Sequence, residues 1–264
     1  MDDPAETRDP RLTFGTVVDV YDEIRPTYPD ELFDAFFSLL GAQPEVLEVG
    51  PGTGQATRDL LARGAAVHAV EISPSMASRL RSNLPTERLQ VSVGDFETID
   101  LAAESADAIF SASAYHWISP AAQLDRPALI LRPGGVLAIV GLFQVDSPED
   151  RGFYAAAQPI YERYGQGHEG PPTEARQDVE PSIAQALARD PRLTDVDVRR
   201  WDWDQTYTAA GYRKLMLSFS DTNMMDAADR AGLLDDMEAY ITSDFDGRVT
   251  RPLVVTLTTA RRAS

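Results

Sequence analysis

Val46-Leu-Glu-Val-Gly-Pro-Gly-Thr-Gly54 carries the strongest indication of the fold in this sequence. Its first residues predict a buried β-strand, and a helix is expected from Thr53 to Arg63, where Gly64 stops it. Glycines at alternate positions after a strand let a ligand approach the backbone, and the following helix offers unpaired amides to an anion. Such a turn suits a nucleotide phosphate or a methionine carboxylate. A tight turn without any ligand is the alternative.

Short β-branched runs alternate with helical stretches along the rest of the chain. Further strands are predicted over residues 66–72, 89–93, 106–112, 136–143, 196–207 and 251–259. This alternation is typical of a parallel sheet with helices on both faces. The sequence therefore predicts an α/β, Rossmann-like fold with a seven-stranded, mostly parallel sheet. In such a sheet the ligand lies beyond the carboxyl ends of the strands.

Three segments do not follow this alternation. They are an N-terminal arm, residues 1–40, with a helix from about Pro29, and insertions at about 147–189 and 209–246, the second expected to hold two helices. Insertions at the ligand-binding edge usually cover the site. We therefore expect residues 1–40 to cover the site and residues 41–264 to form the domain, with both insertions adding to the cover.

The composition narrows the kinds of partner. Forty-two acidic residues against 24 Lys and Arg give a net charge of −18, which argues against nucleic acid because binding it needs clustered basic residues. The chain has no cysteine and three scattered histidines, so no metal site is expected. No stretch approaches the roughly 20 apolar residues that cross a bilayer, and the acidic start, residues 1–6, does not resemble a signal peptide. We expect a cytoplasmic protein without a membrane partner; the sequence does not indicate an oligomeric state.

Polar and apolar residues at the ends of the next strands suit a nucleoside. Glu71 ends the second predicted strand, where an acid can accept hydrogen bonds from both ribose hydroxyls. Ile72 follows it and is placed to lie against an adenine. After the third strand, Asp95 could accept the adenine amino group or form an Asx turn after Gly94, while Phe96 offers a ring and a backbone amide.

A dinucleotide would use the same elements, so a nicotinamide-dependent oxidoreductase is one alternative. Its fingerprint, Gly-x-Gly-x-x-Gly, would place the third glycine at Gln55 when counted from Gly50. That mismatch disfavours the alternative.

Taken together, these motifs resemble the class I S-adenosylmethionine-dependent methyltransferases. The resemblance rests on Val46–Gly54, Glu71-Ile-Ser-Pro74, Gly94-Asp-Phe-Glu97 and Leu131-Arg-Pro-Gly-Gly135. Two further motifs, Tyr21-Asp-Glu-Ile-Arg-Pro-Thr-Tyr-Pro29 and Ser111-Ala-Ser-Ala-Tyr-His-Trp117, resemble the small-molecule branch, methyltransferase type 11 and trans-aconitate methyltransferase-like proteins. The resemblance covers about half of the chain. It implies an antiparallel last strand, S-adenosyl-L-methionine as cofactor and S-adenosyl-L-homocysteine as product.

The resemblance also implies roles for individual residues around the cofactor. The methionine end would be lined by Gly50, Gly52 and Gly54, with Glu48 near its amino group. Glu71 would hold the ribose, Ile72 and Phe96 would sandwich the adenine, Asp95 would meet its amino group, and Met76 would close its edge. Ala112 stands where related sequences often carry Asn, so the backbone of Ser111 is the expected contact there.

The arm and the segment after the fourth strand supply the remaining candidates. Arg25 could pair with the cofactor carboxylate and Tyr21 could lie near the sulfonium, or their motif could simply anchor the arm. Tyr28, Tyr115 and Trp117 are expected in the substrate pocket. His116 is the candidate general base for a hydroxyl or amine acceptor, although a lone histidine is often structural.

The sequence thus predicts methyl transfer to a small-molecule acceptor by direct in-line displacement, with O-, N- or C-methylation left open. The segments expected around the acceptor carry many aromatic and Met side chains and few basic ones, which suits a compact, partly apolar molecule. A non-catalytic S-adenosylmethionine-binding module is the second alternative.

Overall fold

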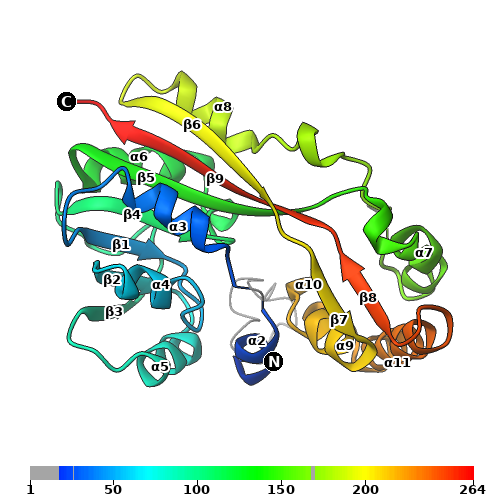
Figure 1. Cartoon of the computed structure of the whole chain (residues 1–264). Helices are drawn as coiled ribbons and strands as arrows, with labels where there is room; N and C mark the ends of the chain where they lie inside the picture. Colours follow the sequence, from blue (N-terminus) through cyan, green and yellow to red (C-terminus); the bar gives the residue numbers. More distant parts are fainter. Residues whose placement is uncertain (1–17, 26, 168–169) are drawn as a thin grey trace, which may run out of the picture.

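A seven-stranded sheet organises the molecule (Figure 1), whose computed structural model describes residues 18–25, 27–167 and 170–264. The strand order is β3-β2-β1-β4-β5-β9-β6, and only β9 runs antiparallel to its neighbours, β5 and β6. This confirms the predicted Rossmann-like sheet with its antiparallel last strand. The strands are β1 (Glu45–Val49), β2 (Ala66–Glu71), β3 (Leu89–Val93), β4 (Ala106–Ala112), β5 (Leu131–Gln144), β6 (Leu193–Asp202) and β9 (Leu253–Arg262).

Helices bury both faces of this sheet. Neighbouring residues of a strand point to opposite faces, so Val46 belongs to one core cluster and Leu47 to the other. The first cluster holds Phe33 and Phe36 of α3 (Asp30–Phe37), Leu60 of α4 (Thr57–Ala62) and Leu80 of α5 (Pro74–Asn83). The second holds Ile130 of α6 (Pro120–Ile130) and Leu187 of α8 (Ser182–Arg189).

The glycine turn delays the helix that was expected from Thr53. Gly50, Gly52 and Gly54 have φ angles of 67°, 60° and 106°, which a right-handed helix does not allow. The α-helix therefore begins only at Thr57.

Two predicted strands are divided by a bend. The expected strand 196–207 forms β6 and then β7 (Gln205–Thr208), while the expected strand 251–259 forms β8 (Arg248–Arg251) and then β9. Pro252 separates β8 from β9 and, lacking an N–H, cannot continue the ladder. β7 and β8 instead pair with each other in a separate two-stranded sheet. The fifth strand is longer than expected, because Leu131 already pairs with Ala106 across a bulge.

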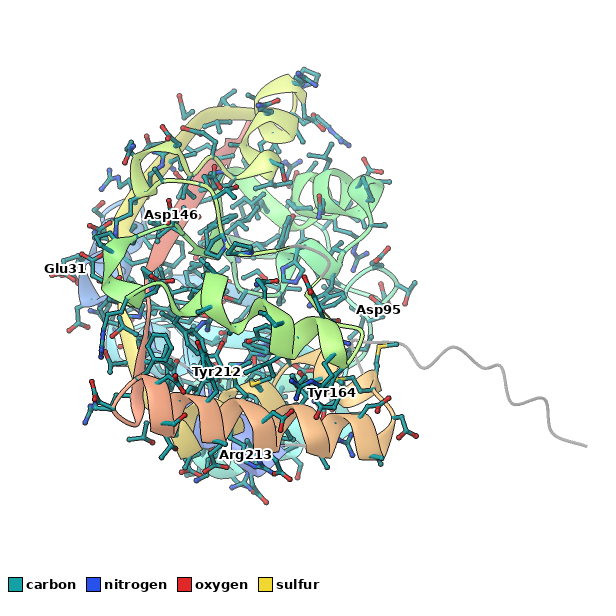
Figure 2. All side chains as sticks on the ribbon, turned by 90° about the vertical axis from the view of Figure 1, so that its right-hand side faces the viewer. Glu31, Asp95, Asp146, Tyr164, Tyr212 and Arg213 are labelled. Carbon is teal, nitrogen blue, oxygen red and sulfur yellow. The ribbon has the colours of Figure 1, made fainter. Side chains whose placement is uncertain are left out.

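A second group of helices packs beside this small sheet, and we call it the helical lobe: α7 (Phe153–Arg163), α9 (Ala209–Leu217), α10 (Ser220–Met224) and α11 (Ala227–Asp244). Its core is separate and rich in aromatic residues, including Phe153, Tyr207 and Tyr212. Tyr212 lies beside α7 and α11, which cross this face of the molecule in Figure 2. The segment 209–246 therefore holds three helices instead of two. The segment 147–189 is divided, since α7 joins the lobe and α8 packs on the main sheet.

The described part of the N-terminal arm has two different environments. α3 belongs to the core of the sheet, whereas α2 (Val18–Ile24) contacts α9 of the lobe and α5. The chain between them is held by Trp203, whose Nε1 donates to the carbonyl oxygen of Thr27 at 3.0 Å. Residues 1–17, which include the start of the expected arm and the acidic terminus, lie outside the described residues.

None of the helices within the described ranges is long and apolar enough to cross a membrane.

Candidate active site

A cavity of about 370 Å³ lies at the carboxyl ends of β1, β2, β3 and β4. This is the edge at which open α/β sheets bind ligands. One wall comes from the sheet, and the opposite wall comes from α2 and the helical lobe. Eleven of the predicted site residues line it: Tyr21, Arg25, Gly50, Gly52, Glu71, Ile72, Met76, Asp95, Phe96, His116 and Trp117.

Glu71 is fixed at the centre of the sheet wall. Its side chain is 6% exposed, and its two oxygens accept hydrogen bonds from the amides of Gly52 at 3.1 Å and Ser73 at 2.9 Å. Burial raises the pKa of this carboxyl, although the backbone hydrogen bonds act against the shift. Each carboxylate oxygen can accept a second hydrogen bond, so Glu71 can still receive two hydroxyl groups.

The residues expected around the adenine line the same cavity beyond Glu71. Met76 and Phe96 are buried, and the guanidinium of Arg126 lies 5.4 Å from the centre of the Phe96 ring. Asp95 also accepts a hydrogen bond from the amide of Glu97 at 2.9 Å. That bond is the expected Asx turn, so Asp95 both shapes the loop and lines the cavity.

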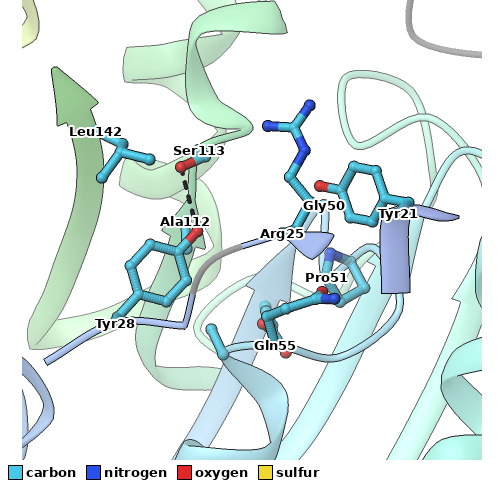
Figure 3. A pocket seen from close by; sticks show the side chains of 11 residues that line it. Tyr21, Arg25, Tyr28, Gly50, Pro51, Gln55, Ala112, Ser113 and Leu142 are labelled. Atoms are coloured by element: carbon cyan, nitrogen blue, oxygen red, sulfur yellow. Dashed lines mark hydrogen bonds between the residues drawn. The ribbon is translucent and has the colours of Figure 1, made fainter. Parts of the chain in front are cut away.

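Next to the glycine turn lies a smaller cavity of about 30 Å³ (Figure 3). Glu48 is one of its lining residues. The Glu48 side chain is buried, and its Oε2 has no hydrogen-bond partner among the described residues. Burial raises its pKa to about 8, and the charge of Glu71 adds to this shift. The Tyr28 hydroxyl, in the same cavity, donates to Ser113 Oγ at 3.2 Å, and burial raises its pKa to about 12.

Arg25 connects the arm to the helical lobe and lines both cavities. Its Nη2 donates to the carbonyl oxygen of Ser218 at 2.6 Å, and its guanidinium lies 4.8 Å from the Tyr21 ring centre and 5.1 Å from that of Phe219. Its buried Nε has no hydrogen-bond partner in the described part of the chain. Arg25 therefore anchors the arm and also presents an unused donor in the cavity that Glu48 and Gly50 line.

Three predicted residues line neither the main nor the small cavity, although Tyr115 lines a third cavity described below. Ser111 is buried and donates from Oγ to the carbonyl oxygen of Val49 at 2.8 Å; Ala112 and Ser113 line the cavity instead. Gly54 serves helix packing, because a Cβ there would lie 2.8 Å from Leu80 Cδ1. The buried Tyr115 donates its hydroxyl to the carbonyl oxygen of Gln123 at 2.7 Å.

His116 stands between the main cavity and a third one. Its ring centre lies 4.9 Å from that of Trp117. Partial desolvation in the cavity wall lowers the pKa of His116, and the charge of Arg25 lowers it further. The third cavity, of about 400 Å³, shares Ser113, His116 and Leu142 with the main one and reaches Tyr115 and α8.

The lobe contributes residues that sequence reasoning missed: Phe219, Ser220, Asp221 and Arg251. For Arg251 the sequence shows only that an arginine precedes Pro252 and an apolar run. Nothing nearby in the sequence indicates that its side chain faces this cavity. Among the described residues, no group of three or more His, Cys, Asp or Glu side chains could hold a metal ion.

Comparisons with known proteins agree with this geometry. Residues 47–139 match a family model of type 11 described as "Methyltransferase domain". An uncharacterized methyltransferase of Mycobacterium tuberculosis is 41% identical over 133 residues, which cover 50% of this chain and 53% of the relative. The chain thus spans about half the length of the curated relatives it matches first.

Solved structures share the fold at low sequence identity. Phosphoethanolamine N-methyltransferase 2 of Haemonchus contortus, in complex with phosphomonomethylethanolamine and S-adenosylhomocysteine, has a TM-score of 0.55 at 15% identity, covering 95% of this chain and 58% of that one. The [4+2]-cyclase SpnF also has a TM-score of 0.55, at 16% identity, covering 96% of this chain and 93% of that one. These likenesses show the fold alone.

The family match over residues 47–139, together with the sheet order and the glycine turn, supports the resemblance to the class I S-adenosylmethionine-dependent methyltransferases. The predicted resemblance is confirmed at this level. The trans-aconitate methyltransferase-like branch stays a prediction.

Proposed function

We propose that this domain binds S-adenosylmethionine in the 370 Å³ cavity and transfers its methyl group to a small-molecule acceptor. The main support for this proposal is Glu71, which is buried and accepts a hydrogen bond from the Gly52 amide. The residues expected around the adenine and those of the glycine turn line the same cavity. A carboxylate fixed in this way is a ready acceptor for two ribose hydroxyls.

The residues present fit both ends of such a cofactor. The unpartnered Oε2 of Glu48 suits a cationic amino group, and the unpartnered Nε of Arg25 suits a carboxylate. Phe96, Ile72 and Met76 supply an apolar surface for the adenine. Glu71 and Asp95 then account for its polar groups.

Bound S-adenosylmethionine supplies an electrophilic methyl group on a sulfonium. The protein needs to align an acceptor with that methyl and to exclude water. We propose that α2 and the helical lobe form the cover, together with the loop after β4. His116, whose lowered pKa keeps the ring neutral near neutral pH, can take the proton of a hydroxyl or amine acceptor. A carboxylate acceptor needs no base.

Cavity size and charge support a small acceptor. The third cavity opens beside His116 and offers about 400 Å³ to the part of the acceptor that lies away from the methyl group. The net charge of −18 does not suit nucleic acid.

Replacing Glu71 tests the cofactor site. Glu71→Ala should weaken S-adenosylhomocysteine binding by about 1–3 kcal/mol, because the ribose hydroxyls lose a charged acceptor. Calorimetry measures the loss, and Glu87→Ala, which removes an exposed acid, serves as the control. Unchanged affinity in a folded Glu71→Ala protein would remove this residue from the site. Micromolar binding of NAD would favour the oxidoreductase instead.

The reaction needs its own test, since one protein of this fold is a cyclase. Incubation with labelled S-adenosylmethionine and a metabolite mixture should label a low-molecular-weight product. Tight cofactor binding without any label transfer would favour a non-catalytic module.

A further inference from the structure

Arg251 is a charged side chain of the helical lobe that faces the main cavity. It is the last residue of β8, directly before the bend at Pro252. Its Nε and Nη2 donate to Gln144 Oε1 at 3.3 and 3.0 Å, and its guanidinium lies 5.6 Å from the centre of the Phe219 ring. A neutral amide and an aromatic face thus hold it in place.

No carboxylate within the described ranges lies within ion-pairing distance of this guanidinium. Arg63, Arg176 and Arg192, by contrast, each contact at least two acidic side chains. The neighbours of Arg251 in the lobe are the hydroxyls of Tyr154, Tyr207 and Tyr212. Burial raises the pKa of all three, so they are neutral and do not balance the charge.

A partly buried cation without a counter-ion is costly unless something else compensates it. The amide oxygen of Gln144 and the Phe219 ring compensate only in part. The hydroxyls of Tyr154 and Tyr207 lie beside the guanidinium of Arg251, but they are neutral and add no counter-charge. A bound anion would supply the missing charge, and the planar fork of arginine suits a carboxylate.

The position of Arg251 separates its role from that of Arg25. The Phe219 ring has both guanidinium groups near it, at 5.1 Å for Arg25 and 5.6 Å for Arg251. Arg25 lies beside Glu48 and the glycine turn, in the small cavity that Arg251 does not line. Arg251 lines the main cavity as part of the lobe, whereas Glu71 lines it as part of the sheet. It therefore faces the side left for the acceptor.

We propose that Arg251 determines specificity by binding a carboxylate of the methyl acceptor, so that the acceptor is a compact monocarboxylate with an apolar body. This inference rests on the proposed function. A single unpaired guanidinium matches one negative charge, and the exposed carboxylate of Asp221 on the same cavity disfavours a dianion such as a phosphate. Few basic side chains were expected around the acceptor, and Arg251 is the exception.

Ligand-observed NMR can test this with a panel of alkyl and aryl monocarboxylates, each paired with its primary amide, on protein saturated with S-adenosylhomocysteine. The carboxylates that bind the wild type should lose about tenfold or more in affinity in Arg251→Met, while the amides stay unchanged. Arg248→Met removes an exposed arginine of the same strand and should behave as the wild type. Arg251→Lys keeps the positive charge but loses the planar guanidinium, which can donate two parallel hydrogen bonds. This variant should weaken carboxylate binding several-fold.

The possible failures are distinguishable. If S-adenosylhomocysteine does not bind the wild type, the proposed function fails. If it binds equally to all variants and no carboxylate of the panel prefers the wild type over Arg251→Met, the role of Arg251 is rejected. A lower melting temperature in Arg251→Met and Arg251→Lys, with equal binding of carboxylates and amides, would show that Arg251 only supports the lobe. If Arg251→Met does not fold, the carboxylate-to-amide preference of Arg251→Lys decides between these outcomes.

Discussion

Three titratable groups with shifted pKa values line the cavities: Glu48 and Glu71 are buried, and His116 is more exposed. Burial raises the pKa of Glu48 and Glu71, whereas desolvation and the nearby Arg25 lower that of His116. Each shift favours the neutral form of the group in the free protein. Perturbed groups of this kind are common at functional sites, because binding or reaction supplies the charge that is missing. Two of these groups give direct predictions.

Glu48 should release a proton when the cofactor binds. With a pKa of about 8 it is mostly protonated at pH 7 in the free protein, and a cationic amino group beside it would lower that pKa. S-Adenosylhomocysteine titrated at pH 7 in buffers of different ionisation enthalpy should therefore release roughly half to one proton, falling as the pH rises above the pKa of free Glu48. Glu48→Gln should bind without this release. An equal proton release from Glu48→Gln would assign the proton to another group.

His116 should define the acidic limb of the rate profile if it acts as a base. A base works in its neutral form, so turnover is full above its pKa and lost as the pH falls through it. Because the pKa is lowered, the limb should lie below the ordinary histidine value of about 6.5. His116→Ala should reduce kcat about 10²–10⁴-fold and leave S-adenosylhomocysteine affinity unchanged. Wild-type turnover in this variant would make His116 structural.

At the level of elements, the main cavity is lined by segments that lie far apart in the sequence. α2, the loop after β4, and α10 with the end of β8 all contribute lining residues. The two halves of the described arm differ here. α3 is built into the sheet core, whereas α2 rests on α9 and α5 without a fully buried residue of its own. A helix held so lightly is suited to move when a ligand enters.

Ligand binding should therefore slow hydrogen exchange in α2 and leave α3 unchanged. Saturating S-adenosylhomocysteine would add contacts to Tyr21 and Arg25, which both line the cavity. Exchange of peptides covering Val18–Ile24 and Asp30–Phe37 measures the two halves in one sample, so α3 is the internal control. Equal exchange of α2 with and without ligand would contradict its role as a cover, and NAD at the same concentration should have no effect.

The whole molecule consists of the sheet with its two core clusters and a helical lobe with a third, aromatic core. β6 leads through the bend into β7, and β8 leads through it into β9 (Figure 1). The lobe is therefore connected to the sheet by the same two segments of chain. One wall of the main cavity thus belongs to the methyltransferase domain and the other to the lobe. We propose that the first wall fixes the cofactor and the second selects the acceptor.

The fold class and the sheet wall of the cavity could be predicted from local sequence patterns. Strand alternation and the glycine turn are local signals, and parallel strands bring their carboxyl ends to one edge, so Gly50, Glu71, Asp95 and Phe96 could be placed without tertiary information. Ser111 and Gly54, which were also expected at the cofactor, do not line the main cavity, because only packing shows which side of a turn faces a helix and which faces a cavity.

The wall formed by α2 and the lobe could not be predicted in this way, because it depends on contacts between distant segments. Arg25 meets Ser218 across 193 residues and Arg251 meets Gln144 across 107, and no periodicity or motif spacing encodes such contacts. The same holds for Tyr28 and Ser113, which are 85 residues apart. Pro252 is visible in the sequence as a break, but the direction in which the chain turns there depends on how β7 and β8 pair and on the core that forms beneath them. The placement of Arg251 on the cavity therefore depends on packing between distant segments. The glycine turn and Glu71, by contrast, are placed by the residues next to them in the sequence.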